Sequence, residues 1–158
     1  KYNATTNGTA KDLGSSTTTF VPVVSIRMNS NRLDSVIVPA SVDIFLSTNG
    51  ATRSAEYRLL LNATLTNPSW TTHANGNVDY DLSATAISAI GTDIVGGFID
   101  TASGQISLAD INNFANQLGR TQRGITGATG SSDTLTIAVR PNASSINAYA
   151  DFSWYEIV

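Results

Sequence analysis

Residues 134–155, TLTIAVRPNASSINAYADFSWY, contain the two clearest strand patterns of the chain. Apolar residues occupy every second position over 134–140 and again over 148–155, which is the period of a β-strand with one buried face. The residues between them, Pro141 to Ser145, are typical of a loop. We therefore predict two strands joined as a hairpin.

Upstream segments repeat this pattern. Strand-like runs cover residues 20–28, 35–46, 57–65 and 94–99. Turn signals separate them, above all Asn49-Gly50 and Asn75-Gly76. Seven or eight short strands with this punctuation, and no strand–helix–strand order, predict an all-β fold: an antiparallel β-sandwich or jelly roll.

Three local features refine this prediction. Pro22 lacks an N–H group, so its strand is expected to lie at an edge or to contain a bulge. Gly96-Gly97 within a strand indicates a bulge or a close backbone approach. Leu60 interrupts the polar face of its strand, so that face is expected to be partly covered.

One short helix is expected over residues 107–118. Ser107 and Asp110 have the spacing of a capping box, the apolar residues that follow recur at helical spacing, and Gly119 provides a stop. A weaker helical pattern covers 83–90.

The chain divides into two parts by composition. Residues 1–19 are mostly Thr, Asn, Ser and Gly, a composition that predicts an extended polar N-terminal arm or linker with no face to bury. Residues 20–158 are expected to form a single β-sandwich domain. Because the chain starts at Lys1 without a Met, we expect either that a leader was removed or that this is a piece of something longer.

The overall composition excludes several classes of protein. Only 13% of the 158 residues are charged, whereas Thr, Ser, Asn and Gly supply 64 of them. A net charge of −3 argues against nucleic acid as a partner. No apolar run approaches the ~20 residues of a spanning helix, so no membrane partner is expected. With no cysteine, the chain has no disulfide, thiolate nucleophile or Cys-ligated zinc.

Candidate catalytic residues are few. His73 is the only histidine, and without a nucleophile-elbow motif it is best interpreted as a solvated loop residue. Asp79 and Asp81, with Asn77 nearby, could bind Ca²⁺, but capping of turns by Asp is the alternative. The only glutamates, Glu56 and Glu156, are expected to face outward rather than to form an acid/base pair. The sequence therefore predicts no enzyme, no cofactor and no metal.

Candidate ligand or interface residues are aromatic or basic. Exposed aromatic rings can stack on sugar rings, and this points to Trp70, Tyr149 and Tyr155. The alternative is that the two tyrosines pack in a subunit interface. Arg120 and Arg123 flank a glycine-rich loop and could form a small patch with Arg140.

The strand sequences resemble a β-rich domain of structural proteins in tailed bacteriophages. The resemblance covers about residues 20–158 and lies in the succession FVPVVSIRM, VIVPASVDIF, EYRLLLNATLT, VDYDLSATAIS, DTLTIAVR and DFSWYEIV. It implies a jelly roll or sandwich on the exterior of a virion, as a head decoration (cement) protein or as a fibre or spike domain. It also implies homo-oligomers, often trimers, in contact with virion proteins such as the major capsid or tail proteins, and no enzymatic activity.

Two functions are therefore expected from the sequence. The first is a non-enzymatic virion structural protein that packs against copies of itself, for which residues 1–19 could serve as an anchor. The alternative is a β-sandwich module that binds carbohydrate or a receptor, with a cell-surface glycan as partner.

Overall fold

The computed structural model describes residues 1–29, 36–48, 50–74, 76–102, 105–108, 132–143 and 146–157. Within these ranges every regular element is a strand, and the prediction of an all-β antiparallel fold is confirmed. No helix in the described part of the chain has the length and hydrophobicity needed to cross a membrane.

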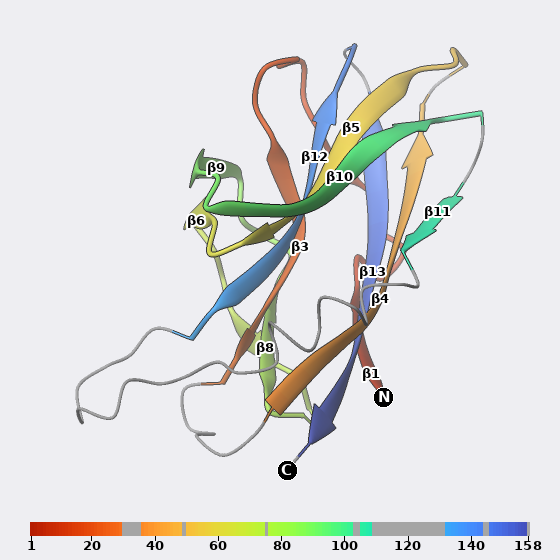
Figure 1. Cartoon of the computed structure of the whole chain (residues 1–158). Helices are drawn as coiled ribbons and strands as arrows, with labels where there is room; N and C mark the ends of the chain where they lie inside the picture. Colours follow the sequence, from red (N-terminus) through yellow and green to blue (C-terminus); the bar gives the residue numbers. More distant parts are fainter. Residues whose placement is uncertain are drawn as a thin grey trace.

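The strands form two large antiparallel sheets and one small one (Figure 1). Sheet A has the order β1-β13-β4-β11, and β2 also pairs with β13; its strands are β1 (Tyr2–Thr5), β2 (Lys11–Asp12), β4 (Val36–Ser47), β11 (Gln105–Leu108) and β13 (Asn147–Ile157). Sheet B has the order β10-β5-β12-β3-β8-β7; its strands are β3 (Val21–Met28), β5 (Ser54–Leu61), β7 (Thr71–Thr72), β8 (Val78–Asp81), β10 (Thr92–Asp100) and β12 (Thr134–Pro141). Sheet C pairs β6 (Thr64–Thr66) with β9 (Ala86–Ala89).

The core lies between sheets A and B. Sheet A contributes Trp154 and Phe152, both fully buried, and sheet B contributes Ile137, Leu59 and Val24 to the same cluster. Burying a side chain of this size stabilises the fold by about 1.5–3 kcal/mol. The alternation that predicted the strands is therefore the alternation between core and outer face, as in a β-sandwich.

The predicted hairpin of 134–155 is wrong, because its two strands belong to different sheets. Strand β12 lies between β3 and β5 in sheet B, whereas β13 lies between β1 and β4 in sheet A. The link after Pro141 crosses from one sheet to the other, and the Asn142 N–H donates to the Ser54 carbonyl at 2.9 Å. Both strands bury the expected faces, and these faces belong to the same core cluster between the two sheets.

The first nineteen residues are part of the fold. Strand β1 pairs with β13 from Tyr2–Trp154 to Thr5–Asp151, and β2 pairs with the same strand at Lys11–Ala148. Ala4 and Leu13 are buried in the main core. The expectation that this segment has no face to bury is therefore wrong. Two buried apolar side chains are enough to place the segment on the core, because hydrogen bonds to β13 hold its backbone.

Local predictions in sheet B are mostly confirmed. At Pro22 the register between β3 and β12 shifts, so the proline lies at a bulge. Gly96 allows a close backbone approach, since a Cβ atom there would lie 2.9 Å from the Tyr57 carbonyl oxygen, and at Gly97 it would lie 2.8 Å from the Tyr57 hydroxyl. The bulge of β10 lies slightly earlier, between Asp93 and Val95. Leu60 is covered on the outer face of the sheet, in a second apolar cluster.

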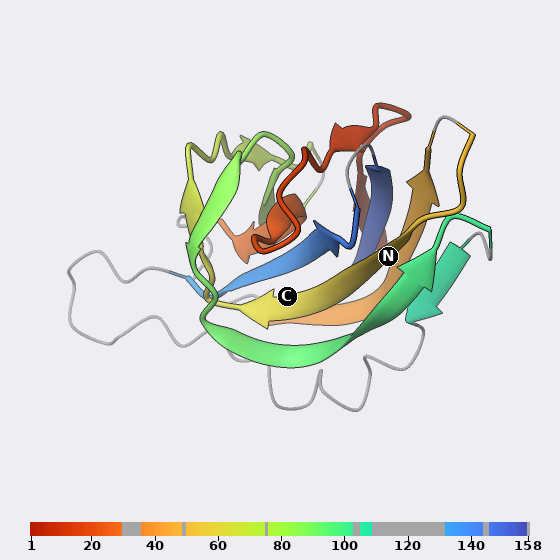
Figure 2. The same cartoon turned by 90° about the horizontal axis from the view of Figure 1, so that it is seen from above.

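The helical predictions are not confirmed. Residues 83–90 include β9, whose backbone pairs with β6. Ser107 and Leu108, the first residues of the helix expected over 107–118, end strand β11, and the rest of that range lies outside the described residues. Figure 2 shows the molecule from above, with β10 and β5 side by side and β11 following β10 along the chain.

Candidate functional site

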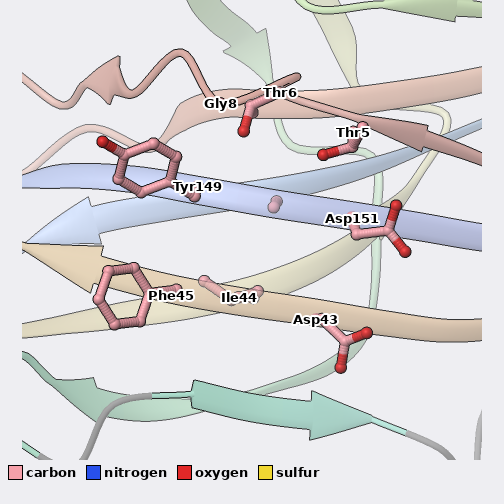
Figure 3. Close-up of a pocket in the computed structure, with 9 residues that line it drawn as sticks. Thr5, Thr6, Gly8, Asp43, Ile44, Phe45, Tyr149 and Asp151 are labelled. Atoms are coloured by element: carbon pink, nitrogen blue, oxygen red, sulfur yellow. The ribbon is translucent and has the colours of Figure 1, made fainter.

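The outer face of sheet A carries an aromatic pair next to an acidic pair. Strands β4 and β13 are in register, so that Phe45 lies opposite Tyr149 and Asp43 lies opposite Asp151. Their neighbours Ile44 and Ala150 point into the core, which places these four side chains on the outer face. We call these four residues the platform (Figure 3).

The two rings of the platform form one tilted surface. Their centroids are 5.9 Å apart and their planes meet at 45°. Phe45 is 45% exposed and Tyr149 is half-buried. Covering an exposed Phe ring removes apolar surface from water, which is favourable. A pair of rings that faces solvent across two strands is therefore a surface suited to binding.

The N-terminal segment forms a rim beside the platform. Between β1 and β2 the chain turns tightly at Asn7 and Gly8, whose φ angles are 54° and 76°, and the Thr9 N–H donates to the Thr6 carbonyl at 2.9 Å. Two successive positive φ angles with this bond describe a type I′ turn, which Asn-Gly favours. The turn and the platform together line a shallow hollow of about 280 Å³.

The two carboxylates of the platform differ in their contacts. Asp151 accepts a hydrogen bond from Asn3 Nδ2 at 2.9 Å and one from Ser153 Oγ at 3.2 Å. Within the part of the chain that the structure describes, Asp43 has no hydrogen bond or ion pair to another side chain. Carboxylate oxygens only accept hydrogen bonds and are strong acceptors, so the pair adds acceptors at the side of the rings.

Of the predicted site residues that the structure describes, only Tyr149 belongs to the platform. Tyr155 lies on the same face of β13 but six positions along, about 20 Å away, and is 47% exposed. Trp70 belongs to the segment before β7, where the Arg27 guanidinium lies 4.2 Å from its ring centre. Arg120 and Arg123 lie outside the described residues.

His73 lies in the link between β7 and β8, as expected, but it is not fully solvated. Its ring is half-buried, with its centre 5.4 Å from Tyr2 and 5.6 Å from Trp154, both edge-on. The ring therefore packs against Trp154 of the core.

Asp79 and Asp81 are held by the hydrogen bonds of the protein itself. Asp79 accepts bonds from Thr72 Oγ1 and Asn29 Nδ2, both at 2.9 Å. Asp81 caps the turn after β8, accepting from Ser83 Oγ at 2.6 Å and from the Ala84 N–H at 3.0 Å. Turn capping, the alternative to Ca²⁺ binding, is thus confirmed for Asp81. In the described ranges no cluster of three or more His, Asp or Glu is placed to hold a metal ion.

The two glutamates have structural contacts on opposite sheets. Glu56 points to the outer face of sheet B, as expected, but is buried there: Arg58 Nε and Nη2 donate to its Oε1 at 2.9 and 2.6 Å, and Arg140 Nη2 donates to its Oε2. The hydrogen bond from Arg58 is the main cause that lowers the pKa of Glu56, against the raising effect of burial. Glu156 accepts the Asn77 N–H at 2.9 Å and Trp154 Nε1 at 3.0 Å.

Sequence reasoning missed Asp43, Phe45 and Asp151, and the rim at Thr6 and Gly8. One signal was present in the sequence. Phe45 alternates with the core residues Ile44 and Leu46, so it shares the solvent-facing side of its strand with Asp43. A large aromatic residue on the solvent side of a strand becomes a candidate for a binding surface when a second ring lies beside it. The partner strand could not be found in this way, because the register of β4 with β13 joins residues about a hundred positions apart.

Comparison with family models, with curated protein sequences and with solved structures yields no match for this chain.

Proposed function

We propose that this chain is a non-enzymatic β-sandwich module that binds carbohydrate on the platform of sheet A. The observation that carries the proposal is the Phe45–Tyr149 ring pair, which lies on the outer face of sheet A beside Asp43 and Asp151. An aromatic ring offers a flat apolar surface to the C–H face of a sugar, and Tyr adds a hydroxyl for hydrogen bonding.

The polar groups around the rings suit the same ligand. Sugars present many O–H donors, and the carboxylates of Asp43 and Asp151 are strong acceptors at the side of the ring pair. The rim adds hydroxyls from Thr5 and Thr6, which can donate or accept. A few convergent polar groups around an apolar surface are the usual composition of a small-ligand site.

The test compares matched exposed aromatic residues on a glycan array, followed by titration with the best ligand. Phe45→Ala and Tyr149→Ala are expected to weaken binding about tenfold or more, because each removes half of the stacking surface. Phe98→Ala is the matched control: Phe98 is 69% exposed but lies on β10 of sheet B. Thermal unfolding of each variant checks that the fold is kept. An empty array, or an equal loss in Phe98→Ala, contradicts the proposal.

The same titration compares the platform with the other two aromatic residues predicted from the sequence, Tyr155 and Trp70. Tyr155→Ala and Trp70→Ala are expected to bind as the unsubstituted chain does, since neither lines the hollow. Recovery of the glycan after long incubation tests the non-enzymatic part. Cleaved product that disappears in Asp43→Asn would show instead that the opposed carboxylates act as a hydrolytic pair.

The virion structural function is a second candidate, which the resemblance to tailed-phage domains implies. The observation that favours it is the set of large apolar side chains exposed outside the platform, Phe98 on β10 and Ile157 at the end of β13, at 69% and 59%. Among the described strands β10 has a neighbour on one side only, and such edges can pair with another copy. Sedimentation at micromolar concentration tests it: a stable oligomer, with a trimer favoured, supports the assembly proposal, and a monomer contradicts it. Electron microscopy of the source particle would locate the chain.

A further inference from the structure

A second hollow continues the platform along strand β4. It has a volume of about 360 Å³ and lies where β4 leads into the link to β5. Phe45 lines both hollows, so the two adjoin at this residue. Each volume lies near the lower end of the range for small-ligand sites.

The second hollow differs from the first in its chemistry. Its walls beyond Phe45 are rich in hydroxyl groups, from Ser47, Thr48, Thr52 and Thr101. These groups can donate and accept hydrogen bonds, whereas the carboxylates of the first hollow only accept. The second hollow therefore suits a ligand that carries both donors and acceptors along its length.

The backbone around the second hollow is held in place before a ligand arrives. Thr48 Oγ1 donates to the Ala51 carbonyl at 2.6 Å, and the Arg53 N–H donates to Thr101 Oγ1 at 2.9 Å. The Thr101 N–H in turn donates to the Arg53 carbonyl at 2.8 Å. These bonds join the β4–β5 link to the end of β10, which reduces the entropy lost on binding.

Charge restricts the ligand further. The described residues that line the two hollows include Asp43 and Asp151 but no Lys or Arg. A ligand with carboxylate or sulfate groups would meet the negative charge of Asp43 and Asp151 there, and the described lining residues supply no cation that offsets it. The lining thus favours a neutral ligand.

We infer that the two hollows are adjoining subsites for one neutral, linear oligosaccharide that lies along β4 across the Phe45 ring. This inference rests on the proposed carbohydrate-binding function and names its ligand class. From Asp43 to Ser47 the strand spans about 13 Å, so one sugar ring on Phe45 cannot contact both ends, whereas a longer chain of sugars can.

Calorimetric titration with neutral gluco-oligosaccharides, from disaccharide to hexasaccharide, tests the inference, with an oligogalacturonate of equal length as the acidic probe. The affinity is expected to rise about tenfold with length, equivalent to ~1.4 kcal/mol, and the acidic probe is expected to bind at least tenfold more weakly. The double variant Ser47→Ala with Thr52→Val is expected to lose the gain with length while keeping the affinity for the disaccharide. Thr92→Val, at the far end of β10, is the control and should keep both.

Each contrary result has a distinct meaning. Affinity that does not change with length, or that falls equally for all lengths in the double variant, overturns the two-subsite inference but leaves carbohydrate binding standing. Stronger binding of the acidic probe overturns the neutral class. If none of these ligands binds and the glycan array is also empty, the inference and the proposed function fail together.

Discussion

Replacing Glu56 by Gln tests the reasoning about the outer face of sheet B most directly. The carboxylate of Glu56 is buried and receives hydrogen bonds from the guanidinium groups of Arg58 and Arg140, and both guanidinium groups lie over the Phe20 ring. Gln keeps the shape and one acceptor oxygen but removes the negative charge. The substitution therefore removes the charge and one of the two acceptors that the arginines use, while it keeps the shape of the side chain.

The magnitude follows from the exposure of the three partners. A hydrogen bond to a charged group contributes about 1.5–3 kcal/mol net when it is buried. Here the two arginine side chains are 30% and 31% exposed, so solvent screens part of this energy. We expect Glu56→Gln to lower the free energy of unfolding by about 2 kcal/mol at neutral pH. With an m-value of about 2 kcal/mol/M, the urea midpoint should fall by about 1 M.

The loss should depend on pH with a defined sign. Because the pKa of Glu56 is lowered in the folded state below its ordinary value of 4.5, the carboxylate stabilises the fold at all pH values above 4.5. That stabilisation is lost as the pH falls through the lowered pKa. The difference between the unsubstituted chain and Glu56→Gln should therefore be constant near neutrality and shrink below pH 4.5.

Urea unfolding followed by tryptophan fluorescence over this pH range measures the difference. Asp93→Asn is the control, because Asp93 pairs with the same Arg58 but is 39% exposed, and its loss should stay within about 0.5 kcal/mol. A Glu56→Gln variant that is as stable as the unsubstituted chain at neutral pH refutes the reasoning. A difference that does not change with pH refutes the assignment of the lowered pKa.

Two further substitutions test the packing. Leu13→Ala should lower the free energy of unfolding in urea by about 2–5 kcal/mol, because Leu13 is fully buried in the main core. Ile157→Ala, at an exposed position, should change it by less than about 0.5 kcal/mol. Equal effects would mean that the N-terminal segment is not part of the fold. Gly91→Ala should lower the melting temperature more than Gly50→Ala, although both glycines have positive φ angles. At Gly91 the new Cβ would lie 2.3 Å from the Leu61 carbonyl oxygen, whereas at Gly50 it would meet no atom within 4 Å. Thermal unfolding of the two variants measures the difference.

The strands could be predicted because the signal for each one is local. Alternation at period two places Phe152 and Trp154 on one face of β13 and Tyr149 on the other, whatever strand lies beside it. The bulge at Pro22 and the close approach at Gly97 are also local, since they follow from a missing N–H and a missing Cβ.

The sequence by itself thus determined an all-β chain with two-faced strands and a surface of small neutral polar residues. The tertiary structure decided which strands are neighbours: it separated β12 from β13, added β1 and β2 to sheet A and aligned Phe45 with Tyr149. The physical reason is that backbone N–H and C=O groups are the same in every strand, so pairing is selected by the packing of the whole core. The platform exists only where two distant strands meet in register, and no short stretch of sequence contains that information.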